Sequence, residues 1–221
     1  MKPHLLIGLT VLLLTFVIGR QVEAMSPKSA MKQISRHYKR VETLQADFRE
    51  VFEWGLTRET IERDGTLAVA SDNRFRIDTP EQLLVSDGEC VYRFDRTNAR
   101  VIIEPVGSGG SSLLPQRLLL EFGDDFRAVS LTETMVAGRD GIRLELVPRD
   151  PDTALIEKVI LWVTTPDDSG NDDWIIHRLK MADMSGNHTT YFLSNIRLDQ
   201  PIDPDATSFI PPEGVELFDL R

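Results

Sequence analysis

The stretch RFRIDTPEQLLVSDGECVYRFDR, residues 74–96, carries the clearest fold signal in the chain. Apolar and polar residues alternate within three short segments of it, as they do in β-strands. Phe75 and Ile77 share one face of the first segment, and a Thr-Pro break separates this segment from the next. A Ser-Asp-Gly-Glu turn at residues 86–89 leads into the third segment. These features predict three consecutive antiparallel strands.

The same alternation continues on both sides of this stretch. Upstream, Ser26 and Pro27 predict the start of an amphipathic helix of about four turns, with Met31, Ile34 and Tyr38 on its apolar face. From Leu44 the period changes to two, which indicates that a strand follows the helix directly. The further strands that this pattern predicts are residues 44–54, 58–70, 100–106, 126–136, 141–148, 156–165, 174–183 and 188–198.

One segment interrupts the strand pattern. Residues 107–112 read GSGGSS, a composition typical of a flexible link, and residues 113–122 are rich in leucine. A helix that is apolar on most sides must be buried on most sides. We therefore expect residues 113–122 to form a short helix that lies over the sheet.

Together these patterns predict a mainly β protein. We expect a single antiparallel sheet of about ten or eleven strands, curled into an incomplete barrel. The N-terminal helix and the short apolar lid helix are expected to cover its concave side.

The N-terminus has the pattern of a secretory signal peptide. Lys2 precedes an apolar run from Leu5 to Ile18, and a small-x-small motif ends at Ala24. The run of 14 residues is short for a membrane span, which needs about 20. We therefore predict a signal peptide over residues 1–24 that is removed on export, followed by one domain over residues 25–221.

Composition argues against several classes of function. The formal net charge of -10 disfavours nucleic-acid binding, which depends on Lys and Arg neutralising phosphates. The sequence has one cysteine and lacks HExxH, GxSxG and a phosphate-binding loop with its lysine. We therefore predict no catalytic residues, no metal site and no cofactor, so that the protein is not an enzyme.

Large apolar residues concentrate in the first half of the chain. They include Phe48, Phe52 and Trp54 upstream, and Tyr92 and Phe94 in the quoted stretch. Two interpretations remain open on these residues alone. They form an ordinary core, or they line a concave face that helices seal and that opens for an apolar ligand.

The chain resembles the LolA type of periplasmic outer-membrane lipoprotein carriers. The resemblance spans nearly the whole chain after residue 24, and rests on the order of several pieces. They are LQADFRE, DGTLAVASDNRFRIDTPEQLLVSDGECVYRFDR, LLPQRLLLEFG and MSGNHTTYFLSNIRLDQPIDPDATSFIPPEGVEL. The most specific parts are the LLVSDG turn with its aromatic strand and the closing F-x-P-P-x-G-V at residues 209–215.

This resemblance implies a periplasmic, cofactor-free chaperone, expected to be monomeric, that binds the acyl chains of lipidated proteins. Such carriers receive lipoproteins from an inner-membrane ABC transporter and deliver them to an outer-membrane receptor. The residues expected to line the lipid cavity are Phe48, Phe52, Phe75, Ile77, Leu84, Tyr92 and Phe94. The residues expected to form the lid are Leu113, Leu114, Leu118 and Leu119.

One departure from the family concerns the lid. Members typically have an arginine that ties the lid to the barrel, and the matching position here is Ser71. Arg74 and Arg76 lie close by and are the candidate latch. An alternative function within the same fold is a lipid or lipoprotein sensor that acts through a protein partner. No additional domain is visible in the sequence, which favours the carrier.

Overall fold

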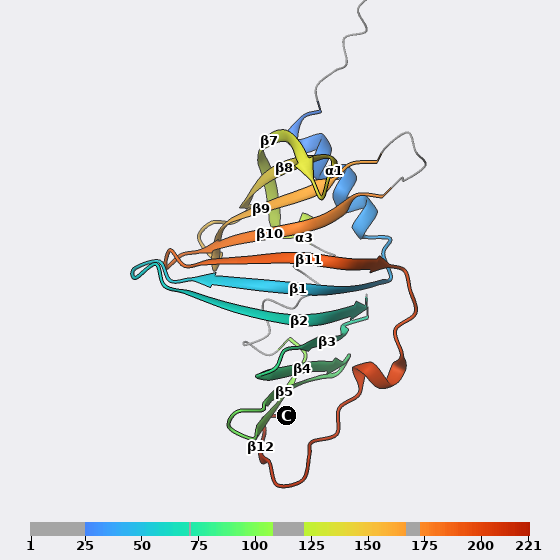
Figure 1. Ribbon diagram of the computed structural model, residues 1–221, viewed down its shortest axis with the longest axis vertical. Helices are drawn as coiled ribbons and strands as arrows, with labels where there is room; N and C mark the ends of the chain where they lie inside the picture. Colours follow the sequence, from blue (N-terminus) through green and yellow to red (C-terminus); the bar gives the residue numbers. More distant parts are fainter. Residues whose placement is uncertain (1–24, 71, 108–121, 167–172) are drawn as a thin grey trace, which may run out of the picture.

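The computed structural model describes residues 25–70, 72–107, 122–166 and 173–221. The signal peptide, Ser71 and the four lid leucines all lie outside these ranges. The described residues form a twelve-stranded open sheet, with the strand order β12-β6-β5-β4-β3-β2-β1-β11-β10-β9-β8-β7 (Figure 1). Its strands are β1 (Thr43–Glu53), β2 (Thr60–Ala70), β3 (Arg74–Asp78), β4 (Gln82–Asp87), β5 (Cys90–Asp95), β6 (Arg100–Pro105), β7 (Phe126–Val136), β8 (Arg139–Pro148), β9 (Ile156–Thr164), β10 (Ile175–Asp183), β11 (His188–Leu198) and β12 (Glu216–Asp219).

The mainly β prediction is confirmed, with one strand more than expected. The additional strand is β12, which pairs with β6 in a parallel ladder, so the sheet is not purely antiparallel. The C-terminal segment returns along the lower half of the sheet before it adds this strand (Figure 1). The sequence did not predict β12, because its four residues are too few for an alternating pattern to be recognised.

Helix α1 (Pro27–Tyr38) begins where the sequence predicts. Ser26 caps it, because its Oγ accepts a hydrogen bond from the backbone N–H of Ser29 at 3.2 Å. Ile34 and Tyr38 are buried on the face that packs toward the upper strands, and α1 contacts β7. The Tyr38 hydroxyl also accepts a hydrogen bond from the backbone N–H of Ile176 in β10 at 2.9 Å. This contact joins the helix to the sheet.

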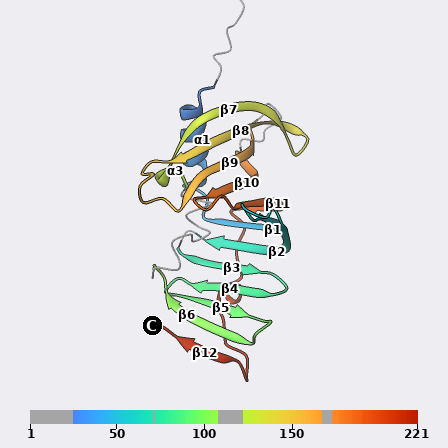
Figure 2. The same ribbon diagram turned by 90° about the vertical axis from the view of Figure 1, so that its left-hand side faces the viewer.

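Two further short helical segments lie within the described ranges. Helix α3 (Phe122–Asp125) precedes β7, and the 3-10 helix η1 (Pro204–Thr207) lies in the C-terminal segment, where it contacts β3 and β4. Figure 2 shows α1 beside the upper strands and the C-terminal segment running past the lower strands to β12. No helix among the described residues is long and apolar enough to cross a membrane.

The two sides of the sheet carry separate apolar layers. The main core joins α1 to the β7–β11 half, and it continues through Leu44, Val69 and Phe75. A second set lies on the other side of the lower strands and comprises Leu83, Val85, Val101 and Ile103. These residues are buried although they do not belong to the main core cluster. The strands β4 to β6 are therefore covered on this second side.

Candidate functional site

One row of side chains crosses the lower half of the sheet and forms a cavity wall. Residues directly opposite each other in antiparallel strands lie on the same face. The pairing runs from Leu67 in β2 through Ile77, Leu84 and Arg93 to Ile102 in β6. All five side chains line the same cavity. We call this side of the sheet the cavity face and the opposite side the outer face.

The cavity has a volume of about 690 Å³, within the usual range of ligand sites of about 300–1,000 Å³. Phe48 of β1 faces Leu193 of β11, and Leu179 of β10 faces Tyr191, so the wall continues across three further strands. The polar residues gather at the β3–β6 end. The described residues that line it are Phe48, Glu50, Arg63, Leu67, Ile77, Thr79, Glu81, Gln82, Leu84, Arg93, Asp95, Thr97, Asn98, Arg100, Ile102, Leu179, Tyr191 and Leu193.

A charged pair interrupts the apolar end of the wall. Glu50 and Arg63 are cross-strand partners, with 3.6 Å between the carboxylate and the guanidinium. Burial raises the pKa of the neighbouring Tyr191, and the negative charge of Glu50 raises it further. The Tyr191 ring also meets Phe48 edge-on at a centroid distance of 6.0 Å. The cavity is therefore amphipathic.

The predicted cavity residues divide into those that line the cavity and those that do not. Phe48, Ile77 and Leu84 line it. Phe52 shares the cavity face but lies beyond Glu50, where its ring packs edge-on against Trp54 at 4.9 Å. Phe75 is also on this face, yet it is only 1% exposed and belongs to the main core. Phe52 and Phe75 are absent from the lining.

The prediction that Tyr92 and Phe94 face the cavity is wrong. Both point to the outer face, where their rings pack against Phe209 at centroid distances of 5.7 Å and 6.0 Å. The Tyr92 hydroxyl donates a hydrogen bond to Asp87 at 2.9 Å. These aromatic residues are covered by the C-terminal segment, so the cavity face of β5 presents Val91 and Arg93 instead.

The two arginines proposed as a latch also lie on the outer face. Arg74 pairs with Asp72 at 2.7 Å. Arg76 donates to Asp78 at 2.7 Å and to the backbone carbonyl of Ala206 in η1 at 3.5 Å. Within the described ranges, these contacts tie β3 to an adjacent acid and to the C-terminal segment. They do not place either guanidinium on the cavity face.

Asp78 is the centre of this outer-face network. It accepts hydrogen bonds from Arg76 and from Arg96, the latter at 2.8 Å. Burial disfavours its charged form, but the hydrogen bonds from the two guanidinium groups outweigh this effect and lower its pKa. A depressed folded-state pKa adds stability above the unfolded value of about 3.9, and this stability disappears as the pH falls through the folded value.

We predict that Asp78→Asn lowers the free energy of unfolding by about 1–3 kcal/mol at pH 7, because charge-assisted hydrogen bonds are lost. The difference from the wild type is expected to shrink as the pH falls below about 4, because the carboxyl group then binds a proton in the unfolded wild-type chain before it does so in the folded protein. Urea unfolding of both proteins from neutral to acidic pH measures the difference in the free energy of unfolding. A difference that stays constant from neutral to acidic pH contradicts the assignment.

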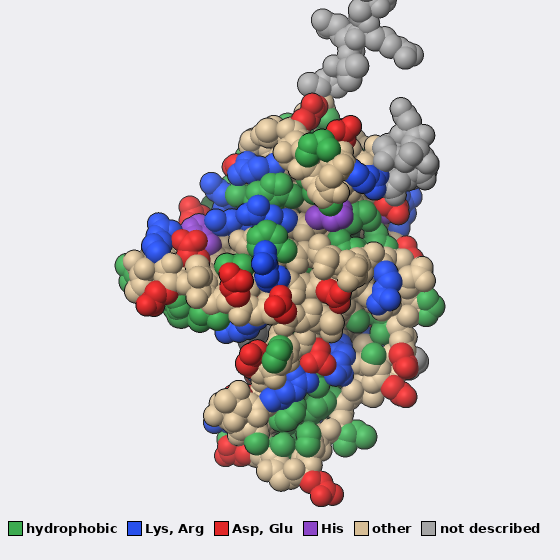
Figure 3. Space-filling view, in the orientation of Figure 1, with side chains coloured by type: hydrophobic (Ala, Val, Ile, Leu, Met, Phe, Trp, Pro, Cys, Tyr) green, Lys and Arg blue, Asp and Glu red, His purple; other side chains and the backbone are tan. Residues whose placement is uncertain are grey.

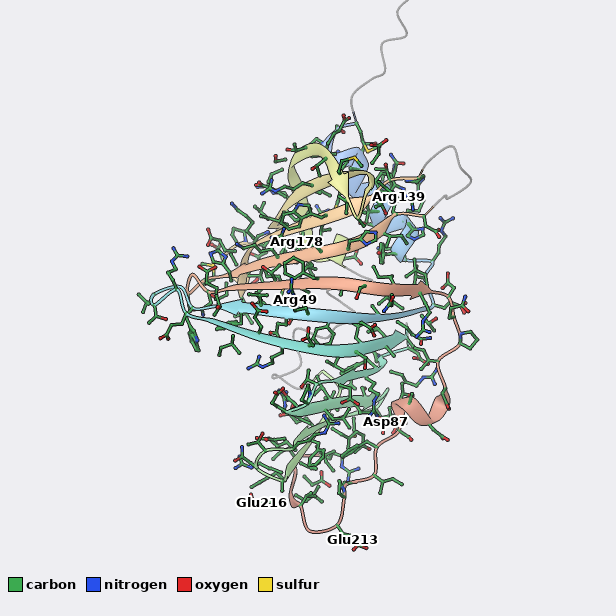
Figure 4. All side chains as sticks on the ribbon, viewed as in Figure 1. Arg49, Asp87, Arg139, Arg178, Glu213 and Glu216 are labelled. Carbon is green, nitrogen blue, oxygen red and sulfur yellow. The ribbon has the colours of Figure 1, made fainter. Side chains whose placement is uncertain are left out.

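The outer face of the upper strands carries a row of alternating arginine and aromatic side chains. The Arg178 guanidinium lies 4.0 Å from the Trp162 ring centroid and 5.0 Å from that of Phe192. Arg49 covers Phe192 at 4.9 Å, and Arg143 approaches Trp162 at 5.7 Å. Figure 4 labels Arg49 and Arg178, and Figure 3 shows cationic and acidic side chains interspersed on this face. Cation–π contacts of this kind stabilise the sheet.

The site therefore differs from the sequence expectation in two ways. Reasoning from the sequence missed Leu67 and Ile102, although both stand in phase within their strands. It also missed Leu179, Tyr191 and Leu193, which come from the far end of the chain. Among the described residues no group of three or more His, Cys, Asp or Glu side chains is arranged to hold a metal.

Comparisons with known proteins show which proteins the chain is similar to. The family model described as "Outer membrane lipoprotein carrier protein LolA" matches residues 39–209. An outer-membrane lipoprotein carrier protein of Azotobacter vinelandii is 24% identical, over 94% of this chain and 97% of the relative. One of Alkalilimnicola ehrlichii is 26% identical, over 84% and 82%. A solved structure from Thermus thermophilus shares the fold, with a TM-score of 0.52 at 12% identity, covering 86% of this chain and 99% of that one.

Proposed function

Because this chain belongs to the LolA family of outer-membrane lipoprotein carriers, we propose that it binds the acyl chains of lipoproteins in the cavity described above. In this proposal the signal peptide is removed and the mature chain carries lipoproteins through the periplasm to the outer membrane. An inner-membrane ABC transporter would load it, and an outer-membrane receptor would unload it. The family is one of carriers rather than of enzymes.

The observation that carries the proposal is the row of apolar side chains in the cavity wall. Leu67, Ile77, Leu84 and Ile102 stand side by side across β2, β3, β4 and β6, with only Arg93 of β5 between the last two. Burial of an acyl chain contributes about 0.8 kcal/mol per methylene group. A wall of this kind therefore provides the energy to hold a lipid anchor out of water.

A carrier must also release its cargo, and the polar residues in the wall favour release. The Glu50–Arg63 pair and the Tyr191 hydroxyl lie beside the apolar side chains of β1 and β11. A methylene group buried against these polar groups contributes less binding free energy than one buried against an apolar surface. The reason is that the polar groups lose contact with water when the acyl chain covers them. The affinity is thereby kept below that of a wholly apolar cavity, which eases transfer to a receptor.

The proposal is tested by the binding of a synthetic tripalmitoyl lipopeptide to the purified mature protein. We expect saturable binding, and we expect Leu84→Glu to weaken it by about tenfold or more, because the new carboxylate would lose hydration against the acyl chain. Fluorescence of a labelled lipopeptide measures the dissociation constant. Native mass spectrometry of protein purified from the periplasm is expected to show bound acyl chains.

Leu155→Glu is the matched control, because Leu155 is 61% exposed and lies outside the cavity lining. Its dissociation constant should equal that of the wild type. Absence of lipopeptide binding by the wild type, or equal binding by the Leu84 variant, would overturn the proposal.

A further inference from the structure

Three arginines among the described residues line the cavity, and two of them are paired with acids. Arg63 lies 3.6 Å from Glu50, and Arg100 lies 3.6 Å from Glu216. Arg93, by contrast, has neither an ion-pair nor a hydrogen-bond partner in the part of the chain that the structure describes. It is the one unpaired arginine of the described cavity wall.

The surroundings of Arg93 explain why its charge is uncompensated. The residues directly opposite it on the two neighbouring strands are Leu84 of β4 and Ile102 of β6, whose side chains offer no acceptor. Asp95 stands two residues further along the same strand, but its oxygens already accept three hydrogen bonds. They come from the backbone N–H groups of Thr97 and Asn98 at 3.0 Å and from the Asn98 amide at 2.7 Å.

An unpaired guanidinium in such a wall is suited to an anionic ligand group. It presents five N–H donors in a planar fork that matches a carboxylate or a phosphate. A charge that is partly removed from water favours a partner of opposite sign, because pairing offsets the loss of hydration. Thr79, Gln82 and Thr97 line the same end of the cavity and provide further polar contacts.

The strand order indicates how an amphiphilic ligand would lie in the cavity. The apolar residues Phe48 and Leu193 lie on β1 and β11, whereas Arg93 lies on β5. Four strand spacings separate β5 from β1, which is about 19 Å. This span is close to the depth of one leaflet of hydrocarbon, about 15 Å. A single acyl chain can therefore span most of the distance from Arg93 to the apolar end.

On the premise of the proposed function, we propose that the cavity prefers amphiphiles that have an anionic headgroup, a carboxylate or a phosphate, bound by Arg93. The acyl chain then runs over Leu84 and Ile77 toward Phe48 and Leu193. A preferred ligand then has an anionic group as well as the acyl chain that a lipoprotein carrier binds. It identifies acidic lipids, or an acidic group close to the lipid anchor, as preferred cargo.

The test compares three probes on the full mature protein, each below its micelle concentration. Palmitate offers a carboxylate, lysophosphatidylglycerol a phosphate, and monopalmitin no charge. Displacement of a fluorescent fatty acid or isothermal calorimetry gives the dissociation constants. We expect Arg93→Gln to weaken the binding of at least one anionic probe by about tenfold or more. Monopalmitin binding should change by less than about twofold, and Arg93→Lys should restore part of the loss.

Arg49→Gln is the matched control, because Arg49 lies on the outer face over Phe192 and should leave all three constants unchanged. A selective loss for palmitate identifies a carboxylate site, and a selective loss for the lysophospholipid identifies a phosphate site. An equal loss for monopalmitin, or no loss for either anion, overturns the inference while lipopeptide binding still supports the carrier function. Failure of the wild type to bind any probe or the lipopeptide overturns both.

Discussion

Phe75→Ala lowers the free energy of unfolding by about 3–5 kcal/mol, the expected cost of removing a buried phenyl ring. Phe75 is 1% exposed and lies between Val69 of β2 and Ser86 of β4, both fully buried. Neither neighbour can move to fill the space, since each is held in a strand ladder. Urea unfolding followed by circular dichroism measures the change.

Phe52→Ala provides the comparison for this prediction. Phe52 occupies the same face near the end of β1, but it is only partly buried, so its truncation should cost clearly less than that of Phe75. Lipopeptide binding by the folded Phe75→Ala protein should remain close to the wild-type value, because Phe75 does not line the cavity. A variant that folds with wild-type stability, or that folds but does not bind, would contradict its assignment to the core.

The helix and most of the sheet could be predicted from local patterns. Ser26 and Pro27 predict the start of α1, and the structure places the cap and the first helical residue there. The Asp-Gly turn after β4 predicts a hairpin, and Gly88 adopts a φ of 100°, which favours glycine. Hydrogen bonds between residues close in sequence determine these features, so a short stretch of sequence is enough to predict them.

The faces of β4, β5 and β6 could not be predicted in the same way. Leu83, Leu84 and Val85 are consecutive apolar residues, as are Val101, Ile102 and Ile103. Runs of this kind indicate a strand covered on both sides, so they leave the cavity face undecided. What decides it is the C-terminal segment, where Phe209 covers Tyr92 and Phe94 from more than a hundred residues away.

The other half of the cavity depends on a non-local pairing. β1 pairs with β11, and this ladder brings Leu193 opposite Phe48 and Tyr191 opposite Glu50. Strand pairing between distant segments leaves no mark in the local pattern of either strand. The sequence therefore predicted the Phe48, Ile77 and Leu84 part of the wall, and missed Leu179 and Leu193.

The approach of Phe48 to β2 leads to the second large prediction. Gly65 stands opposite Phe48 in the β1–β2 ladder, and the ring lies across it. A Cβ at residue 65 would lie 2.6 Å from Cζ of Phe48 and 2.5 Å from the backbone carbonyl oxygen of Asp78. Either distance is too short, so the ring or the neighbouring strand must shift.

Gly65→Ala is therefore expected to lower the free energy of unfolding by about 1–3 kcal/mol, the usual cost of overpacking. It is also expected to weaken lipopeptide binding, because Phe48 lines the cavity and a displaced ring changes the surface that an acyl chain contacts. Chemical unfolding and the lipopeptide dissociation constant measure the two effects on the same protein.

A double-mutant cycle with Phe48→Ala separates the two close contacts. Removing the ring relieves one clash and leaves the clash with the Asp78 carbonyl, so the two stability changes should fail to add by about 0.5–3 kcal/mol. Strict additivity would mean that the carbonyl contact alone carries the cost and that the ring does not depend on Gly65. Non-additive effects on both stability and binding would instead show that Phe48 depends on the absence of a side chain at residue 65. The ring then lies against the wall, and the cavity stays open to an acyl chain.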